Sequence, residues 1–490
     1  MNADPSGLRL ASPEGRWVVA AMVLGSGVTF LNSTVVNVAL PSIAEDLDTD
    51  LAGLQWVTNG YLLTLAALIL VGGSAGDIYG RKRMFLYGMG LLCAGSVLGG
   101  VAPELWVVVA GRLLQGVGAS LMVPASLAIV DAAFHPDDKG AAIGAWASGS
   151  ALSTATGPLL GGVLIEALNW RVVFFISLPL AVVATWATWR HVPESRDPRA
   201  RTLDLRGGGL AVIAVSGITY ALVQAPTDGW GDGPVVLTAT IGVLAIAMFV
   251  VAERASGDPM LPFRLFSSRQ FSGANLYTLV VYLALGGAFF FLTIQLQTVV
   301  GWSATAAGAA TLPMSFLTII GSPVAGKLSA RHGPRVLLVT GPLAMAGGLL
   351  LLSAIDADAS YLTDVVPGVI IMGVGLATMV APLTASVLAA AAADDVGIAS
   401  AVNNAVARVG SLLATALLPA AAGITGAVGG AEFARGYERA LLISAVLCVV
   451  GSAVAWMTIT RSVETHTAQQ TSVASGCTQV SVPDPAAATG

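Results

Sequence analysis

Two loops of this chain share one pattern: GSAGDIYGRKR at residues 73–83 and GKLSARHGPR at residues 326–335. Each loop follows an apolar stretch and precedes another, so the chain repeats one unit in the same direction, as parallel internal repeats do. The second copy keeps the glycines and the basic residues, but Ala330 stands where the first copy has Asp77. The repeat predicts two similar halves.

Working outward from these loops, we find fourteen stretches of about 20 mostly apolar residues, long enough to cross a hydrocarbon core of roughly 30 Å as helices. Hydrophobic residues make up 55% of the chain, charged residues only 10%, and the mean hydropathy is +0.80. Such values exclude a soluble enzyme. The predicted spans are 17–40, 54–76, 83–101, 104–131, 140–165, 171–190, 207–225, 234–254, 271–299, 306–327, 336–354, 364–390, 396–427 and 438–460.

The predicted fold class is therefore an all-α polytopic membrane protein with 14 transmembrane helices in a 6 + 2 + 6 arrangement. Six helices belong to each repeat, and two extra helices lie between them. The expected parts are an N-terminal segment (1–16), an N-terminal six-helix bundle (17–190), a linker with two extra helices (191–270), a C-terminal six-helix bundle (271–461) and a disordered tail (462–490).

The basic residues predict the orientation, since cytoplasmic loops hold Lys and Arg in excess. With both termini cytoplasmic, 18 of the 23 basic residues lie inside and three outside, and the other two, Arg112 and Arg408, fall within helices. Twenty Arg against three Lys suggest a bacterial protein, so we expect a multi-pass protein of the bacterial cytoplasmic membrane. The net charge of -5 gives no indication of nucleic-acid binding.

The loop GDIYGRKR is a candidate gate. Asp77 ends the second predicted helix, Gly80 permits a tight turn, and Arg81 and Lys82 follow at headgroup level. The carboxylate can pair with basic groups of the neighbouring bundle and hold one conformation shut. A plain positive-inside loop would explain the basic residues but not the spacing of the acid.

The segment RLLQGVGAS at residues 112–120 places Arg112 and Gln115 one turn apart within an apolar helix. Burying a guanidinium near mid-membrane costs from about 2.5 to more than 10 kcal/mol, so Arg112 should face a polar cavity and have partners. Snorkelling is the alternative. It is disfavoured, because the outer end of the helix lies about eight residues, or roughly 12 Å, away.

The fifth span, GSALSTATGPLLGG, carries small residues at four-residue intervals, with Gly157 and Pro158 at a kink. Small residues alone are common in membrane helices, but the combination with a kink indicates a surface where two bundles rock. Polar stripes on the first and thirteenth spans predict walls of a hydrated cavity, with interhelical hydrogen bonding as the alternative. The candidate cavity residues are Asn32, Ser33, Asn37, Asn59, Arg112, Gln115, Asn275, Tyr282, Phe291, Gln295, Asn404 and Arg408.

These motifs together resemble the major facilitator superfamily, specifically its fourteen-helix drug:proton antiporters. The loop at residues 73–83 is similar to the superfamily signature between helices 2 and 3. RLLQGVGAS is similar to the helix 4 signature, and residues 149–162 resemble the helix 5 antiporter signature. LNSTVVNVALP and residues 170–179 resemble helix 1 and helix 6 patterns of the fourteen-helix group. The resemblance implies the major facilitator fold, alternating access and proton antiport.

Two departures from the family pattern bear on coupling. Ile78 stands where the loop pattern usually has Arg, and Asn32 stands where the helix 1 pattern usually has Asp. An amide cannot release a proton, so Asp77 and Asp131 are the remaining candidates for titration. No Asp or Glu lies near the centre of a predicted helix, so Arg112 and Arg408 should make the cavity positive and favour neutral or anionic amphiphiles.

The predicted function is secondary active export of hydrophobic or amphiphilic small molecules such as drugs, antibiotics or secondary metabolites, by a monomer that needs no cofactor. A lipid translocator would use the same helices and is the alternative, and a non-transporting membrane sensor is a further one. No phosphate-binding loop, catalytic cluster or metal-ligand spacing emerges, so an enzyme is not expected.

Overall fold

The computed structural model describes residues 7–197, 203–257, 259–392, 395–424, 426 and 428–460. Within them the chain forms fourteen long helices, three of which are broken into two pieces, and no β-strand. The first seven are α1 (Pro13–Asp46), α2 (Leu51–Tyr79), α3 (Arg81–Gly100), α4 (Leu105–Ala133), α5 (Pro136–Ala167), α6 (Val172–Phe175) with α7 (Ser177–His191), and α8 (Leu205–Asp228).

The chain continues through the extra helix α9 and the second repeat. These helices are α9 (Gly233–Ala255), α10 (Arg269–Thr298), α11 (Ala304–Ala310) with α12 (Leu312–His332), α13 (Arg335–Leu352), the π-turn η2 (Tyr361–Val365) with α14 (Val366–Ala389), α15 (Val396–Ala422) and α16 (Gly430–Thr458). A 3₁₀ turn, η1 (Phe263–Ser267), leads into α10.

The all-helical prediction is confirmed, and each of the fourteen predicted spans corresponds to one helix. Several boundaries differ by a few residues, and the largest difference is at α16, which begins at Gly430 rather than at 438. Its first two turns are polar, and hydropathy reports the apolar span rather than the helix end. The three breaks fall where Pro179, Pro313 and Pro367 open the next piece, since proline cannot donate the backbone hydrogen bond that continuity needs.

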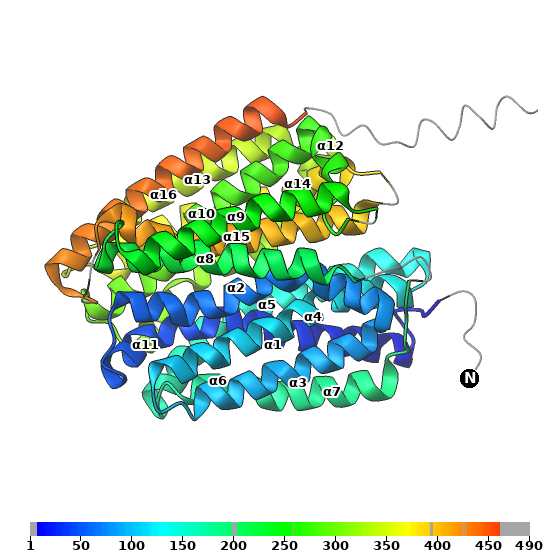
Figure 1. Ribbon diagram of the computed structural model, residues 1–490, viewed down its shortest axis with the longest axis horizontal. Helices are drawn as coiled ribbons and strands as arrows, with labels where there is room; N and C mark the ends of the chain where they lie inside the picture. The colour runs from blue at the N-terminus through cyan, green and yellow to red at the C-terminus, as the bar shows by residue number, and fades with distance from the viewer. Residues whose placement is uncertain are drawn as a thin grey trace, which may run out of the picture.

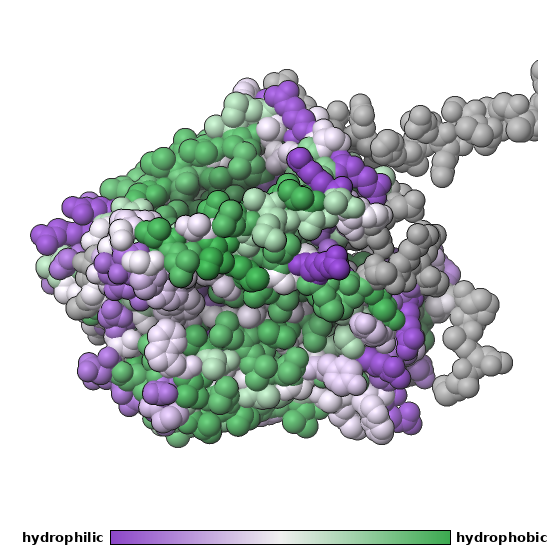
Figure 2. Space-filling view, in the orientation of Figure 1, coloured by the Kyte–Doolittle hydropathy of each residue, from purple (hydrophilic) through white to green (hydrophobic). Residues whose placement is uncertain are grey.

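On the face shown in Figure 2, apolar residues cover the middle of the molecule, and polar residues gather at its two ends. Within the described residues, thirteen helices are long and apolar enough to span a membrane. The exception is α5, whose 32 residues include many Gly, Ser and Thr, although it runs beside the others and packs on α1. The chain is thus a multi-pass membrane protein.

The helices form two groups with a helix pair between them (Figure 1). Helices α1 to α7 pack on one another and are called the N half below; α10 to α16 pack on one another and are called the C half. Helix α8 contacts both α2 of the N half and α15 of the C half, and α9 packs on α8. The division into domains at residues 190 and 270 stays a prediction, and the tail 462–490 lies outside the described residues.

Both described ends of the chain lie at the same end of the bundle, on the right in Figure 1. We call it the terminal end and the opposite one the far end. The loops α2–α3, α4–α5 and α12–α13 lie at the terminal end, and the loops α1–α2, α5–α6 and α15–α16 at the far end.

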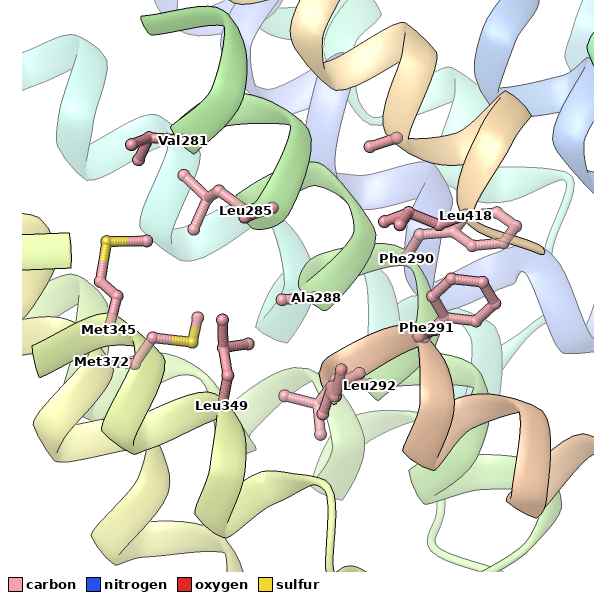
Figure 3. Packing of buried hydrophobic residues seen from close by; sticks show 14 of the residues in the cluster. Val281, Leu285, Ala288, Phe290, Phe291, Leu292, Met345, Leu349, Met372 and Leu418 are labelled. Atoms are coloured by element: carbon pink, nitrogen blue, oxygen red, sulfur yellow. The ribbon is translucent and has the colours of Figure 1, made fainter. Parts of the chain in front are cut away.

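The core of the C half surrounds α10 (Figure 3). Phe291 lies there at 0% exposure, packed edge-on against Phe290 and against Phe433 of α16. Gln295 is also fully buried, and its amide donates to the carbonyl of Ile355 beyond α13 at 3.0 Å. The expectation that both residues face a cavity does not agree with this placement. A single apolar helix gives no indication of which of its faces meets water.

Candidate functional site

Arg112 of α4 is 2% exposed and lies in the interior of the N half. Its Nε donates to the carbonyl of Val57 on α2 at 3.1 Å, and one terminal nitrogen donates to the carbonyl of Asn32 on α1 at 3.1 Å. The same nitrogen donates to Oε1 of Gln115 at 2.9 Å. One guanidinium therefore connects three helices, because its planar fork reaches acceptors in several directions.

Neutral groups complete the surroundings of this cation. The Tyr61 ring lies 4.6 Å from the guanidinium carbon, a cation–π distance, and its hydroxyl donates to the carbonyl of Thr29. Gln115 donates in turn to Ser96 of α3 at 2.9 Å and approaches Oδ1 of Asn32 at 3.5 Å. Arg112 thus contacts Val57, Asn32, Gln115 and the Tyr61 ring, none of which supplies a negative charge.

Within the described part of the chain, Arg112 forms no salt bridge, and the two acids that are more than nine-tenths buried, Glu253 and Asp395, lie toward the terminal end. Asp395 is paired with Arg264 at 2.7 Å. At the position where the family pattern has a carboxylate, Asn32 offers its backbone carbonyl to the guanidinium and its side-chain amide to the carbonyl of Val28. The positive charge of Arg112 thus remains uncompensated.

Arg408 of α15 approaches the N half from the other side. Its guanidinium lies 5.7 Å from the centroid of the Phe30 ring of α1, and its Nε is buried with no hydrogen-bond partner among the described residues.

The remaining predicted cavity residues divide by exposure. Ser33 and Asn37 of α1 are half-buried, as is Tyr282 of α10, whereas Asn404 of α15 is exposed. By contrast, Asn275 is 4% exposed and accepts from Asn403 at 3.2 Å, which also donates to Thr278. Asn403 forms an interhelical contact that the sequence analysis did not predict, although a polar residue in an apolar helix often indicates an interhelical hydrogen bond.

The polar stripe predicted on α1, which consists of Ser26, Thr29, Ser33 and Asn37, likewise divides in two. Ser26 and Thr29 are buried in contacts with other helices of the N half, as Ser26 accepts from Trp146 of α5 at 2.8 Å. These two positions follow the alternative of interhelical hydrogen bonding, while Ser33 and Asn37 stay accessible.

Polar contacts join the halves on α2 and α15. Gln55 donates to the carbonyl of Thr415 at 2.6 Å, and the Thr415 hydroxyl donates to Oδ1 of Asn59. On the other pair of helices, Gln297 of α10 donates to the carbonyl of Val38 on α1 at 3.1 Å. Asn59, expected in the cavity, is 0% exposed and holds the two halves together.

A second junction joins α5 to α11. A Cβ added to Gly308 would come within 2.2 Å of the carbonyl oxygen of Pro158, and one added to Gly162 within 2.5 Å of that of Ala304. Glu166 of α5 accepts from the amide of Thr305 at 2.6 Å. Only glycine permits this backbone contact.

All of these cross-half hydrogen bonds lie toward the far end of the helices. Within the described residues we find none between the two halves at the terminal end. The two halves are therefore held together by hydrogen bonds at the far end, and the described residues form no comparable hydrogen bonds between the halves at the terminal end.

The face of α5 that carries small residues at four-residue intervals packs on α1 of its own half, and not on the C half as expected. Cβ atoms added to Gly149, Gly157 and Gly161 would contact Val23, Thr34 and Val35, all on α1 of the same half. The contact with the C half comes instead from the neighbouring positions Pro158 and Gly162. The period alone predicts close packing but does not indicate the partner.

The α2–α3 loop is fixed within the N half. Asp77 pairs with Arg81 at 2.8 Å, and Arg81 also donates to a carbonyl of α4. Gly80 has φ +113°, and a Cβ there would lie 2.6 Å from the carboxylate of Glu194, which accepts from the amide of Lys82 at 3.0 Å. Glu194 thus caps α3 from the segment after α7, a role that no local pattern signals.

Asp131 pairs with Lys139 at 2.8 Å across the α4–α5 turn, with both side chains at least one-third exposed. Within the described residues no group of three His, Cys, Asp or Glu is arranged to hold a metal ion.

Comparison with known proteins agrees with this arrangement. The family model for the Major Facilitator Superfamily matches residues 22–415, with a second match over 274–483. The chain belongs to this superfamily. A bacterial homolog of the human lysosomal transporter Spinster, in an inward-facing and unoccupied crystal structure, has the same fold with a TM-score of 0.66 at 18% identity, over 91% of this chain and 97% of that one.

Related chains include resistance proteins of Mycobacterium and Streptomyces. The multidrug resistance protein Stp of Mycobacterium tuberculosis is 35% identical over 81% of this chain and 73% of its own length. The puromycin resistance protein of Streptomyces alboniger is 35% identical over 83% and 81%, and the methylenomycin A resistance protein of Streptomyces coelicolor is 31% identical over 93% and 95%.

Proposed function

We propose that this protein exports amphiphilic small molecules across the bacterial cytoplasmic membrane, that its site prefers neutral or anionic compounds, and that both termini are cytoplasmic. Relatives named for resistance to several drugs and antibiotics support export. The observation that carries the substrate preference is Arg112, 2% exposed and held only by neutral groups, together with Arg408, whose guanidinium lies 5.7 Å from the centroid of the Phe30 ring of α1. A positive site of this kind repels lipophilic cations.

The closed far end supports alternating access. With the terminal end cytoplasmic, the described conformation faces inward, and the contacts of Gln55, Asn59 and Gln297 form the outer closure. Export requires these contacts to break while the terminal end closes. Asp77, paired with Arg81 in this conformation, is available to find a partner in the C half when that end closes.

Proton antiport is part of the proposal because it is the family's usual mode of energising export. Asn32 cannot carry the proton, so the carboxylates left for coupling are Asp77 and Asp131, both at the terminal end. Collapse of the pH gradient in everted vesicles should stop accumulation of a fluorescent substrate. Accumulation that continues under an intact membrane potential would remove proton coupling while leaving export in place.

Transport assays test the charge preference. Everted vesicles should accumulate an acidic aromatic compound faster than a cationic dye of similar size, and Arg408→Ala should reduce that difference. A matched control is Arg439→Ala, because Arg439 lies at the far end in α16. Faster uptake of the cation, with no effect of Arg408→Ala, would defeat the proposal.

The alternative is a lipid translocator. It rests on helix α8, which contacts α2 of the N half and α15 of the C half and so lies along the boundary between the halves. Reconstituted liposomes with labelled lipid distinguish the two: flipping of the label at the rate of drug export would favour the lipid.

A further inference from the structure

The carboxyl group of Glu253, in the last turn of α9, is buried at the base of the inserted helix pair. Glu253 is 2% exposed. One oxygen, Oε2, accepts from the amide of Leu261 at 2.8 Å, in the segment that leads into α10. The other oxygen, Oε1, has no hydrogen-bond donor among the described residues. A buried, unpartnered carboxylate oxygen is costly and requires a cause.

The unpartnered oxygen faces a second carboxyl group, that of Asp204. Oδ2 of Asp204 and Oε1 of Glu253 lie 2.5 and 2.7 Å from one and the same point, the position that a Cβ on Gly207 would occupy. Oδ1 of Asp204 is already engaged, because it accepts from the amide of Gly207 and caps α8 at 2.8 Å. Each carboxyl group thus has one oxygen bound to a backbone amide and the other turned toward its neighbour.

Among the described residues, the basic side chains near this pair have other contacts or are exposed. On α9 itself, Arg254 lies over the Phe263 ring at 5.4 Å, and on α8 Arg206 is exposed. From the neighbouring elements, Arg264 pairs with Asp395 at 2.7 Å, and at the end of α2, which packs on α8, Asp77 pairs with Arg81. Among the described residues no cation pairs with either carboxyl group, so ionisation of one disfavours ionisation of the other.

We propose that Glu253 and Asp204 together form a proton-binding site that fastens the inserted helix pair to the segment leading into the C half. One proton, taken from the cytoplasmic solution, forms an O–H···O bond between Oε1 of Glu253 and Oδ2 of Asp204 and satisfies the unpartnered oxygen. Loss of that proton leaves two facing negative charges. Repulsion then separates the start of α8 from the end of α9, with Leu261 attached to the latter.

The position of the site makes this fastening consequential. Helix α8 contacts both α2 and α15, so it lies on both halves at once, and a Cβ added to Gly208, next to Gly207, would come within 2.6 Å of Val71 on α2. Any separation at Gly207 therefore changes how α8 covers the seam between the halves. The inference does not depend on the compound that is exported or on how export is energised.

Infrared spectroscopy of the full chain in lipid nanodiscs, titrated from about pH 6 to about pH 9, tests the proton directly. Wild type should retain a carboxylic-acid C=O band at neutral pH that disappears on alkalinisation. Glu253→Gln should lack that band, and Asp204→Asn should lose it at lower pH, since the neighbouring charge is gone. Asp228→Asn, an exposed acid at the opposite end of α8, should leave it unchanged.

Thermal unfolding provides the second measurement. The native state binds a proton that the unfolded state releases, so the Tm of wild type should fall as the pH rises through this range, whereas the Tm of Glu253→Gln should fall less. A band that persists in Glu253→Gln, no carboxylic-acid band in wild type, or equal pH dependence of Tm in both proteins would overturn the proposal. Stabilisation by millimolar Mg²⁺ without the band would also overturn it, in favour of a cation.

Discussion

Changing Asn32 to Asp should convert the preference of the site from anions to cations. Asn32 already contacts the Arg112 network, with its carbonyl 3.1 Å from the guanidinium and its Oδ1 3.5 Å from Gln115. A carboxylate at this place would lie about 5 Å from the guanidinium and interact with it by roughly 3 kcal/mol at an effective dielectric constant of about 20. The uncompensated charge of Arg112 would then be neutralised.

The effect on a substrate follows from the same estimate. A ligand charge about 8 Å from the new carboxylate would feel roughly 2 kcal/mol, which is about thirtyfold in affinity, favourable for a cation and unfavourable for an anion. Uptake of an acidic aromatic compound and of a cationic dye into everted vesicles measures both changes. Asn169→Asp, the same substitution at an exposed far-end position, should change neither.

One result would refute the reasoning behind this substitution. If Asn32→Asp is expressed at wild-type level and its ratio of cation to anion transport stays within threefold of wild type, the charge of the Arg112 network does not reach the substrate. The buried guanidinium would then serve only to hold α1, α2 and α4 together.

Three further substitutions test other parts of the structure. Arg112→Lys loses the planar fork, and with hydrogen bonds to charged groups worth about 1.5–3 kcal/mol each, we expect a lower Tm and at least tenfold slower export. Gly308→Val clashes with α5 at 2.2 Å and should lengthen spin-label distances between α5 and α11, whereas Gly144→Val, with open space, should not; unchanged distances would contradict the outer closure. Gly80 has φ +113°, and the Cβ that Gly80→Ala adds would lie 2.6 Å from the carboxyl group of Glu194. The substitution should therefore lower Tm by several degrees in a thermal-shift assay, and an unaltered Tm would refute the role of the turn.

Length and apolarity were enough to predict the helices, because a membrane span has to satisfy its backbone within one segment. The same rule explains the misplaced start of α16, whose polar first turns extend beyond the apolar span. Helix α5 was predicted from the length of its mostly apolar stretch, although its apolarity is below that of the other thirteen helices.

The site was less predictable, because a polar residue in an apolar helix indicates a polar contact but does not indicate which residue is its partner. Arg112 was expected to face a polar cavity with a partner and Gln115 to line that cavity, whereas both are buried among neutral partners in the N half. Tyr61 and Ser96, which complete the network, carry no distinctive spacing. Asn59 and Gln295 were placed in the cavity for their polarity, yet one joins the halves and the other holds a loop. The rotation of each helix about its own axis decides whether a polar residue faces a cavity or a neighbouring helix, and this rotation could not be predicted from the sequence.

The central claim is that the substrate site is positive and has no acid of its own. Equilibrium binding to the purified protein of two compounds with one aromatic scaffold, one bearing a sulfonate and the other a trimethylammonium group, tests it most directly. The account predicts at least tenfold tighter binding of the sulfonate, reduced several-fold by Arg408→Ala and by high salt. Tighter binding of the trimethylammonium compound to the wild-type protein would contradict it.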